Sequence, residues 1–255
     1  MSEKFENKRP FAETLTPSSF TVRLSELKEH PHIVVRRSRL DVSTKEKLAE
    51  EVVKLNENKA LFATVEEAGM RVAKFDYAIG NKGLDGWAES YALVEKIDGE
   101  NLADIKKIDA EAAQEVDRCY AAYLEHLLWT IREGGRYWSD MHADQIVYGT
   151  RENDTEPHAY VVDLDPFWDA LTSKEERKDN PPKVLSEIRV LVGRLRALYI
   201  ELREAERKMN GNGQLLMTHR KFYEVAEKVS PIVAEFGSRQ VKEDFSLLQK
   251  ELKKS

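Results

Sequence analysis

The sequence has almost no cysteine and no excess of positive charge, and each absence excludes a class of protein. The 255 residues include one cysteine, Cys119, so neither an intrachain disulfide framework nor a cysteine-based zinc site can form. The 40 lysine and arginine residues are outnumbered by 46 aspartate and glutamate residues, which gives a net charge of −6. Because nucleic-acid phosphates are bound by basic faces, we expect no clear nucleic-acid binding.

Long apolar runs are also missing. No stretch approaches the ~18 uninterrupted apolar residues of a membrane-spanning helix. Residues 1–10 are charged and lack the apolar segment of a signal peptide. We therefore expect no membrane span and a cytoplasmic location. Glycine is unevenly placed: the chain has 12 glycines, and none precedes Gly69.

The chain contains enough apolar residues to form a hydrophobic core. The hydrophobic fraction is 41%, and a chain of this length can form one large domain or two small lobes. The charged fraction of 34% exceeds the roughly 25% of an average globular domain. This excess indicates long helices with solvated faces.

The first hundred residues show mainly the alternation typical of β-strands. A helical pattern interrupts them over 44–68 and stops at Gly69, since glycine commonly ends a helix. The predicted strands lie at residues 11–16, 20–24, 32–36, 70–77 and 91–95.

Beyond residue 100 the apolar residues recur every three or four positions, which is the helical period. A hairpin of 145–148 and 159–162 interrupts the helices. The predicted helices are 109–133, 183–208, 216–236 and 238–253. The order indicates an α+β protein with two parts. Residues 1–97 form a small antiparallel-sheet lobe with one long helix, and 98–255 form a mainly helical lobe that carries the hairpin.

Polar residues cluster at one end of the predicted hairpin. Asp140 and Gln145 precede its first strand and Asp163 follows its second, so an antiparallel pairing brings all three together. Two carboxylates and an amide suit a hard cation such as Mg²⁺. A carboxylate not bound to the metal can orient or deprotonate a hydroxyl group. Acidic residues near turns are often solvated caps, but Asp163 follows an apolar strand and needs a cation or donors there.

Two segments, Trp138–Tyr148 and Tyr160–Asp165, carry a family resemblance. Together they resemble the catalytic loop and metal-binding strand end of the protein-kinase-like superfamily. The nearest branch contains the aminoglycoside, choline and lipopolysaccharide-core kinases. The resemblance implies a two-lobed kinase-like fold that uses ATP and Mg²⁺. It makes Asp140 the catalytic base and Gln145 and Asp163 the metal ligands.

Further positions follow from the same resemblance. His142 matches the histidine often found two residues after the catalytic aspartate, and either a chemical or a loop-bracing role fits it. The segment Tyr91–Leu102 is similar to the fifth strand and interlobe hinge of the family. This similarity implies that backbone groups near Glu95 and Ile97 contact adenine.

The residues expected to bind phosphate depart from the family pattern. Arginine, Arg36 or Arg37, stands where the family has its strand lysine, and a planar guanidinium is not equivalent to an ammonium group. Lys74 sits in a lysine-like motif, but after the helix rather than before it. Glu51 is the expected glutamate partner of the strand cation, with Glu50 as the competitor.

The glycine-rich phosphate loop has no counterpart. Thr16–Ser19 is the only turn in the right place, and its backbone approaches phosphate less closely than glycine does. Gln145 replaces the asparagine of the family and adds a methylene group. No activation segment of the protein-kinase type follows Asp163.

These observations favour an ATP- and Mg²⁺-dependent phosphotransferase that acts on a hydroxyl group of a small molecule or glycan. Its partners are then the nucleotide and an unidentified hydroxyl-bearing acceptor. The departures keep a second hypothesis open: a pseudokinase, used for nucleotide sensing or protein interaction. A third hypothesis retains the fold but transfers the nucleotidyl group.

Overall fold

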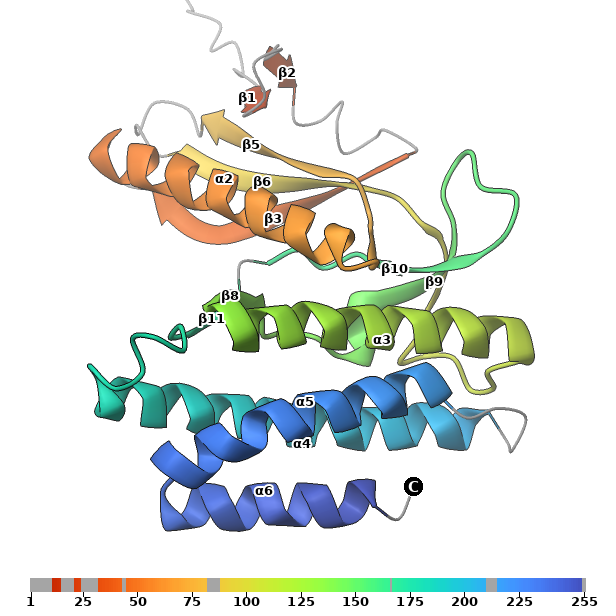
Figure 1. Cartoon of the computed structure of the whole chain (residues 1–255). Helices are drawn as coiled ribbons and strands as arrows, with labels where there is room; N and C mark the ends of the chain where they lie inside the picture. Colours follow the sequence, from red (N-terminus) through yellow and green to blue (C-terminus); the bar gives the residue numbers. More distant parts are fainter. Residues whose placement is uncertain are drawn as a thin grey trace, which may run out of the picture. The chain divides into compact units, whose positions relative to one another are not determined.

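The structure is a computed structural model of the whole chain. It describes residues 11–14, 21–23, 32–42, 45–81, 88–165, 167–209 and 215–253 (Figure 1). For residues 11–14, 21–23, 36–42, 45–48, 78–81 and 88–90 it describes the backbone alone. The chain is an α+β protein, as predicted, and it divides into two compact units. The first comprises residues 1–62, 73–98 and 150–154, and the second comprises residues 63–72, 99–149 and 155–255.

The first unit contains an antiparallel sheet with the strand order β2-β1-β5-β6-β3. Its strands are β1 (Phe11–Thr14), β2 (Thr21–Arg23), β3 (Ile33–Val42), β5 (Phe75–Asn81) and β6 (Ala88–Glu95). Apolar residues face each other across the central strands: Val35 pairs with Leu93, and Val94 pairs with Phe75. The strands predicted at 32–36 and 91–95 are confirmed. The strand predicted over 20–24 corresponds to β2, and its first and last residues, Phe20 and Leu24, lie outside the described residues.

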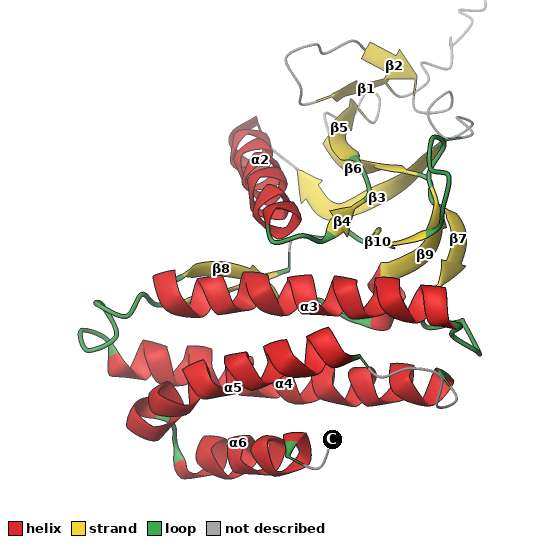
Figure 2. Ribbon diagram, turned by 45° about the vertical axis from the view of Figure 1, so that its right-hand side comes forward, coloured by secondary structure: helices red, strands yellow, loops and turns green. Residues whose placement is uncertain are grey.

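Helix α2 (Lys45–Glu67) confirms the helix predicted over 44–68. The rings of Phe62 and Phe75 meet edge to face with centroids 5.5 Å apart, so the helix packs on β5. The Phe75 ring in turn contacts Tyr77 of the same strand. Both ribbon views show α2 along the sheet of this unit (Figure 2).

The prediction of one strand over residues 70–77 is wrong. The chain leaves α2 at Gly69, whose φ of 103° favours glycine. It then forms β4 (Arg71–Val72), which pairs in parallel with β10 (His158–Val161). After residues 73 and 74 it enters β5, in the sheet of the first unit. Two short strands with different partners show the same alternation as one longer strand, so the pattern could not separate them.

The second sheet has the strand order β4-β10-β9-β7. Its strands β9 (Ile146–Thr150) and β10 pair in antiparallel register, which confirms the predicted hairpin. Strand β7 (Asp98–Asn101) was not predicted, because this segment was interpreted as a hinge. A Cβ atom on Gly99 would clash with the carbonyl oxygen of Tyr148, so only glycine allows β7 to approach β9 this closely.

Four helices complete the second unit. They are α3 (Ala110–Glu133), α4 (Pro181–Lys208), α5 (Leu216–Phe236) and α6 (Arg239–Leu252). All four predicted helices are therefore confirmed, with boundaries shifted by at most two residues. Figures 1 and 2 show α3 in one layer, α4 and α5 in the next, and α6 beyond them. Among the described residues, no helix has the length and apolarity that crossing a membrane requires.

Helix α3 has a signal at each end. Asp109 caps its start, because one carboxylate oxygen accepts the N–H of Ala112 at 2.9 Å. Gly134 and Gly135 follow its last residue with φ values of 81° and 112°, in the left-handed region that ends helices. Between them the apolar period buries a face of the helix against α5 and β10.

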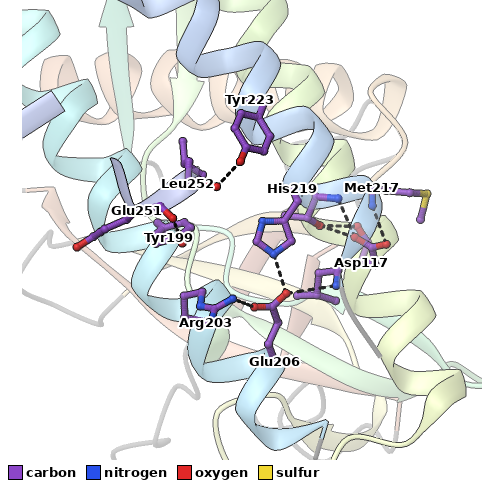
Figure 3. A network of polar contacts seen from close by, with 11 residues as sticks. Asp117, Tyr199, Arg203, Glu206, Met217, His219, Tyr223, Glu251 and Leu252 are labelled. Atoms are coloured by element: carbon purple, nitrogen blue, oxygen red, sulfur yellow. Dashed lines mark hydrogen bonds and ion pairs between the residues drawn. The ribbon is translucent and has the colours of Figure 1, made fainter. Parts of the chain in front are cut away.

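The start of α5 is held by a residue of α3 rather than by its own sequence. Leu215, at the N-cap position, makes no side-chain capping bond. Instead the Asp117 carboxylate accepts the N–H groups of Met217 at 3.0 Å and Thr218 at 2.8 Å (Figure 3). The Thr218 hydroxyl lies 2.7 Å from the same carboxylate. Asp117 therefore acts as a tertiary helix cap.

A second polar contact joins α4 to α5, close to the Asp117 cap in Figure 3. The Glu206 carboxylate lies 2.7 Å from Nε2 of His219 and 2.6 Å from a guanidinium nitrogen of Arg203. The Tyr199 hydroxyl donates to the carbonyl oxygen of Glu251 at 3.1 Å and so joins α4 to α6. These bonds join α4 to α5 and to α6.

Candidate functional site

The predicted loop residues gather at one end of the β9–β10 hairpin. A short 3₁₀ helix, η2 (Ala143–Gln145), leads directly into β9. The N–H of Val162, just past β10, donates to the carbonyl oxygen of Gln145 at 3.0 Å. Because Asp163 is the next residue, the hairpin brings Gln145 and Asp163 to the same end, as the sequence predicted.

Gln145 joins the loop residues through its side-chain amide. The amide nitrogen donates to Oδ2 of Asp140 at 3.0 Å and lies 2.8 Å from Nε2 of His142. An amide nitrogen donates and does not accept, so this geometry makes Nε2 of His142 the acceptor. Nδ1 of His142 lies 3.4 Å from Oδ2 of Asp144. Both amide hydrogens of Gln145 are thus used, and its oxygen is the atom left to bind a cation.

Burial differs among these side chains in a way that suits a reactive site. Gln145 is buried, whereas the side chain of Asp140 is 27% exposed and that of His142 is 31% exposed. Asp144 is open to solvent at 71%. The amide is therefore fixed inside the loop, while the Asp140 carboxylate can be reached from outside.

A half-buried carboxylate that the sequence analysis missed supports this loop. Oε2 of Glu201, on α4, accepts the N–H of Ala143 at 2.7 Å. Burial raises the pKa of the Glu201 carboxyl, and the Ala143 N–H and nearby His142 partly oppose that rise. The only sequence signal was an acidic residue between Leu198 and Leu202, both buried, on the apolar face of a helix. Its partner lies 58 residues away, so the pattern could not assign a role.

The other end of the loop is held by an unpredicted two-stranded ribbon. Strands β8 (Gly135–Trp138) and β11 (Trp168–Leu171) pair with Trp138 opposite Trp168. Next to this pair, the N–H and the hydroxyl of Ser139 both donate to the carbonyl oxygen of Phe167, at 2.9 and 3.1 Å. The residue before Asp140 is thus tied to the segment that follows Asp163.

The donor types at the hairpin end suit a hard divalent cation. Asp163 is half-buried, and its Oδ1 accepts the N–H of Asp165 at 3.4 Å. With the Gln145 oxygen it offers the carboxylate and carbonyl groups that Mg²⁺ prefers. No group of three or more histidine, cysteine, aspartate or glutamate side chains with metal-binding geometry occurs in the described part of the chain.

The predicted phosphate-side residues lie in the first unit. Arg36 lies in β3 opposite Ala92 of β6, and its side chain is outside the described part of the structure. Glu51 lies on α2 and is only 5% exposed, whereas its competitor Glu50 is exposed. Burial raises the pKa of the Glu51 carboxyl, and the nearby Lys54 opposes the rise. Among the described residues its Oε1 has no hydrogen-bond partner.

The residues predicted to contact adenine lie at the end of strand β6 and just after it. Glu95 is the last residue of β6, and its N–H donates to the carbonyl oxygen of Lys74 at 2.7 Å. Its side chain accepts the N–H of Lys74 at 3.2 Å. Ile97 is half-buried and lies between β6 and β7. Lys74 itself was expected within a strand; it lies between β4 and β5 with an exposed side chain.

The turn Thr16–Ser19, the only one placed where the family has its phosphate loop, lies outside the described residues. A scan against protein-family models, a search of curated proteins and a search of solved structures each found no match to this chain.

Proposed function

We propose that the protein is an ATP- and Mg²⁺-dependent phosphotransferase with a two-lobed kinase-like fold, acting on a hydroxyl group of a small molecule or glycan. The observation that carries the proposal is the loop at the hairpin end. There Asp140, His142 and Gln145 are joined through one amide, and Asp163 lies at the same end of the ribbon.

Asp140 has the position and exposure of a general base. Its partly exposed carboxylate can accept a hydrogen bond from an acceptor hydroxyl, orient it and take its proton during transfer. Gln145 supports the geometry of this carboxylate through its amide N–H. Glu201 fixes the backbone of the same loop, so Asp140 is held rather than free to rotate with a mobile loop.

The metal and nucleotide contacts complete the proposal. Asp163 and the amide oxygen of Gln145 would hold Mg²⁺, which neutralises phosphate charge when it is bound. In the first unit, Arg36 would contact phosphate with Glu51 as its partner. Backbone groups of Glu95 and Ile97 would contact adenine.

A pseudokinase is the second candidate, and one contact favours it. The Gln145 amide already donates to Oδ2 of Asp140, so this oxygen is less available to an acceptor hydroxyl than Oδ1 is. The absence of glycine before Gly69 adds to this, because phosphate must then be held without a glycine-rich loop.

A thermal-shift titration with ATP tests nucleotide binding. A ligand that binds the folded state raises the melting temperature by mass action. We expect a shift with Mg²⁺·ATP that is reduced in Asp163→Ala and unchanged in Asp179→Ala, which removes an exposed carboxylate before α4. No shift at millimolar nucleotide would refute the phosphotransferase and a nucleotide-sensing pseudokinase, and would leave only a pseudokinase used for protein interaction. An equal shift in parent and Asp163→Ala would remove Asp163 from the metal site.

Turnover separates the two candidates. With a panel of hydroxyl-bearing acceptors, the phosphotransferase predicts release of ADP that falls by about 10²-fold or more in Asp140→Ala. Binding without ADP release in the parent would favour the pseudokinase. Release of pyrophosphate instead of ADP would indicate nucleotidyl transfer.

A further inference from the structure

A cavity of about 650 Å³ lies between the first half of α4 and the start of α6, within the second unit. Its volume falls within the roughly 300–1,000 Å³ typical of small-molecule sites. Most of its lining surface is apolar, and polar and charged side chains are interspersed among the apolar residues, a mixture that small-molecule sites use for orientation. Residues that line it include Leu185, Arg189, Val192, Gly193, Arg196 and Val241.

Gly193 forms part of the wall, and nothing within the chain requires a glycine there. It lies in the interior of α4, where alanine is favoured over glycine. A Cβ atom added to it would have no other atom within 4 Å. The position is exposed, so packing does not exclude a side chain either. A glycine of this kind leaves the helix backbone open to close approach by a ligand.

The charges around the cavity are not balanced. Arg196 pairs with Oδ1 of Asp244 at 2.8 Å, and Gln240 donates to Oδ2 of the same carboxylate at 3.3 Å. Asp244 is therefore fully engaged. Arg189 makes no hydrogen bond or ion pair with any residue that the structure describes. Its guanidinium group is the free cation of the cavity, and its planar donors suit an oxyanion.

We propose that this cavity binds a small organic anion whose apolar body lies over Gly193 and whose acidic group pairs with Arg189. The volume of about 650 Å³ suits a small molecule, whereas a docked protein segment would bury a larger surface. The site is separate in its residues from the loop of Asp140 and does not depend on the phosphotransferase proposal.

Two fluorescent probes with the same aromatic body test the charge requirement. The anion 8-anilinonaphthalene-1-sulfonate carries a sulfonate, and the neutral N-phenyl-1-naphthylamine lacks it. We expect saturable binding of the anion at one site per chain, and about fivefold weaker binding of the neutral probe, as expected of one partly exposed ion pair. Equal affinities for the two probes would overturn the role of Arg189.

Variants at the two key positions test the location. Arg189→Gln should weaken the binding of the anionic probe about fivefold and leave the binding of the neutral probe unchanged. Gly193→Leu should weaken both probes by about tenfold or more, because its side chain fills the cavity. The matched controls lie on the same helix outside the lining: Arg207→Gln removes a cation, and Ala197→Leu adds bulk. Both controls should bind like the parent.

Gly193→Ala guards against a folding artefact. Because alanine is the better helix former, this variant should melt at or above the parent temperature while binding both probes more weakly. Unchanged binding in Gly193→Ala and Gly193→Leu would place the probes elsewhere and refute the site. Absence of saturable binding in the parent would refute it as well. Competition of the anionic probe by an acidic peptide, and not by small carboxylates, would show that the occupant is a protein segment.

Discussion

Single buried groups in this chain are held in one protonation state by their surroundings. The thiol of Cys119 lies in α3 with 4% of its surface exposed. Burial raises its pKa to about 12, and the nearby carboxylate of Glu115 adds to the rise. Since the thiolate is the reactive form, this cysteine is inert in the folded chain.

Thiol labelling checks this directly. With 5,5′-dithiobis(2-nitrobenzoate) at pH 8, we expect no reaction of Cys119 in the native protein and one equivalent in urea. The reaction should become measurable in native conditions only through unfolding, because a pKa of about 12 leaves very little thiolate at pH 8. Rapid labelling that does not depend on urea would contradict the burial of this side chain.

The candidate site shows which residue positions a sequence can predict. Gln145 and Asp163 were predicted to lie together because an antiparallel hairpin fixes which ends meet. Glu201 could not be found, because its contact with Ala143 depends on how α4 packs in the second unit. Local pairing follows from the order of residues, whereas a contact across 58 positions follows from packing.

Among the elements, α5 depends on another helix for its start. The first N–H groups of a helix have no partner within it, and α5 has no capping side chain of its own. The buried carboxylate of Asp117 accepts two of these groups and the Thr218 hydroxyl. Without it, the N–H groups of Met217 and Thr218 would lose this partner, and Thr218 is fully buried.

Asp117→Ala should therefore destabilise the protein by about 3 kcal/mol, measured by urea unfolding. Asp109→Ala is the matched comparison, because Asp109 caps α3 through one bond at an exposed position. That variant should lose only about 1 kcal/mol. Equal losses in the two variants would show that Asp117 contributes no more than an ordinary surface cap.

The elements that the sequence predicted and those it missed differ in where their partners lie. Helices α3 to α6 have long apolar periods and were found within two residues of their ends. Strands β8 and β11 have four residues each and pair across a separation of about thirty positions. Short strands of this kind are defined by their partner rather than by their own alternation, so periodicity cannot detect them.

At the scale of the whole molecule, neither unit is a continuous stretch of the sequence. Residues 63–72 belong to the second unit although they precede residues 73–98 of the first, and residues 150–154 return to the first. The predicted division at 97/98 follows the order of the sequence, which cannot represent such returns. Each unit therefore depends on segments from both halves of the chain.

The stability of the second unit should depend on pH through one histidine. His126 is 1% exposed, its Nε2 has no hydrogen-bond partner in the described structure, and its ring meets Trp168 edge to face. Burial lowers its pKa to about 4 from the ordinary value of 6.5. At pH 5 the unfolded chain binds a proton at this residue and the folded chain does not. Stability is therefore complete above pH 6.5 and falls as the pH drops from 6.5 toward 4.

Urea unfolding at pH 7 and pH 5, monitored by tryptophan fluorescence, measures this effect. The fluorescence reports on the second unit because Trp129, Trp138 and Trp168 all lie there. Between pH 7 and pH 5, the free energy of unfolding of the parent should fall by about 2 kcal/mol more than that of His126→Leu. The linkage relation gives this difference for the shift in the pKa of His126. The variant serves as the control for every other titrating group, because only the imidazole differs. Equal losses in parent and variant would mean that His126 can be protonated in the folded state, and its burial without a partner would then be wrong.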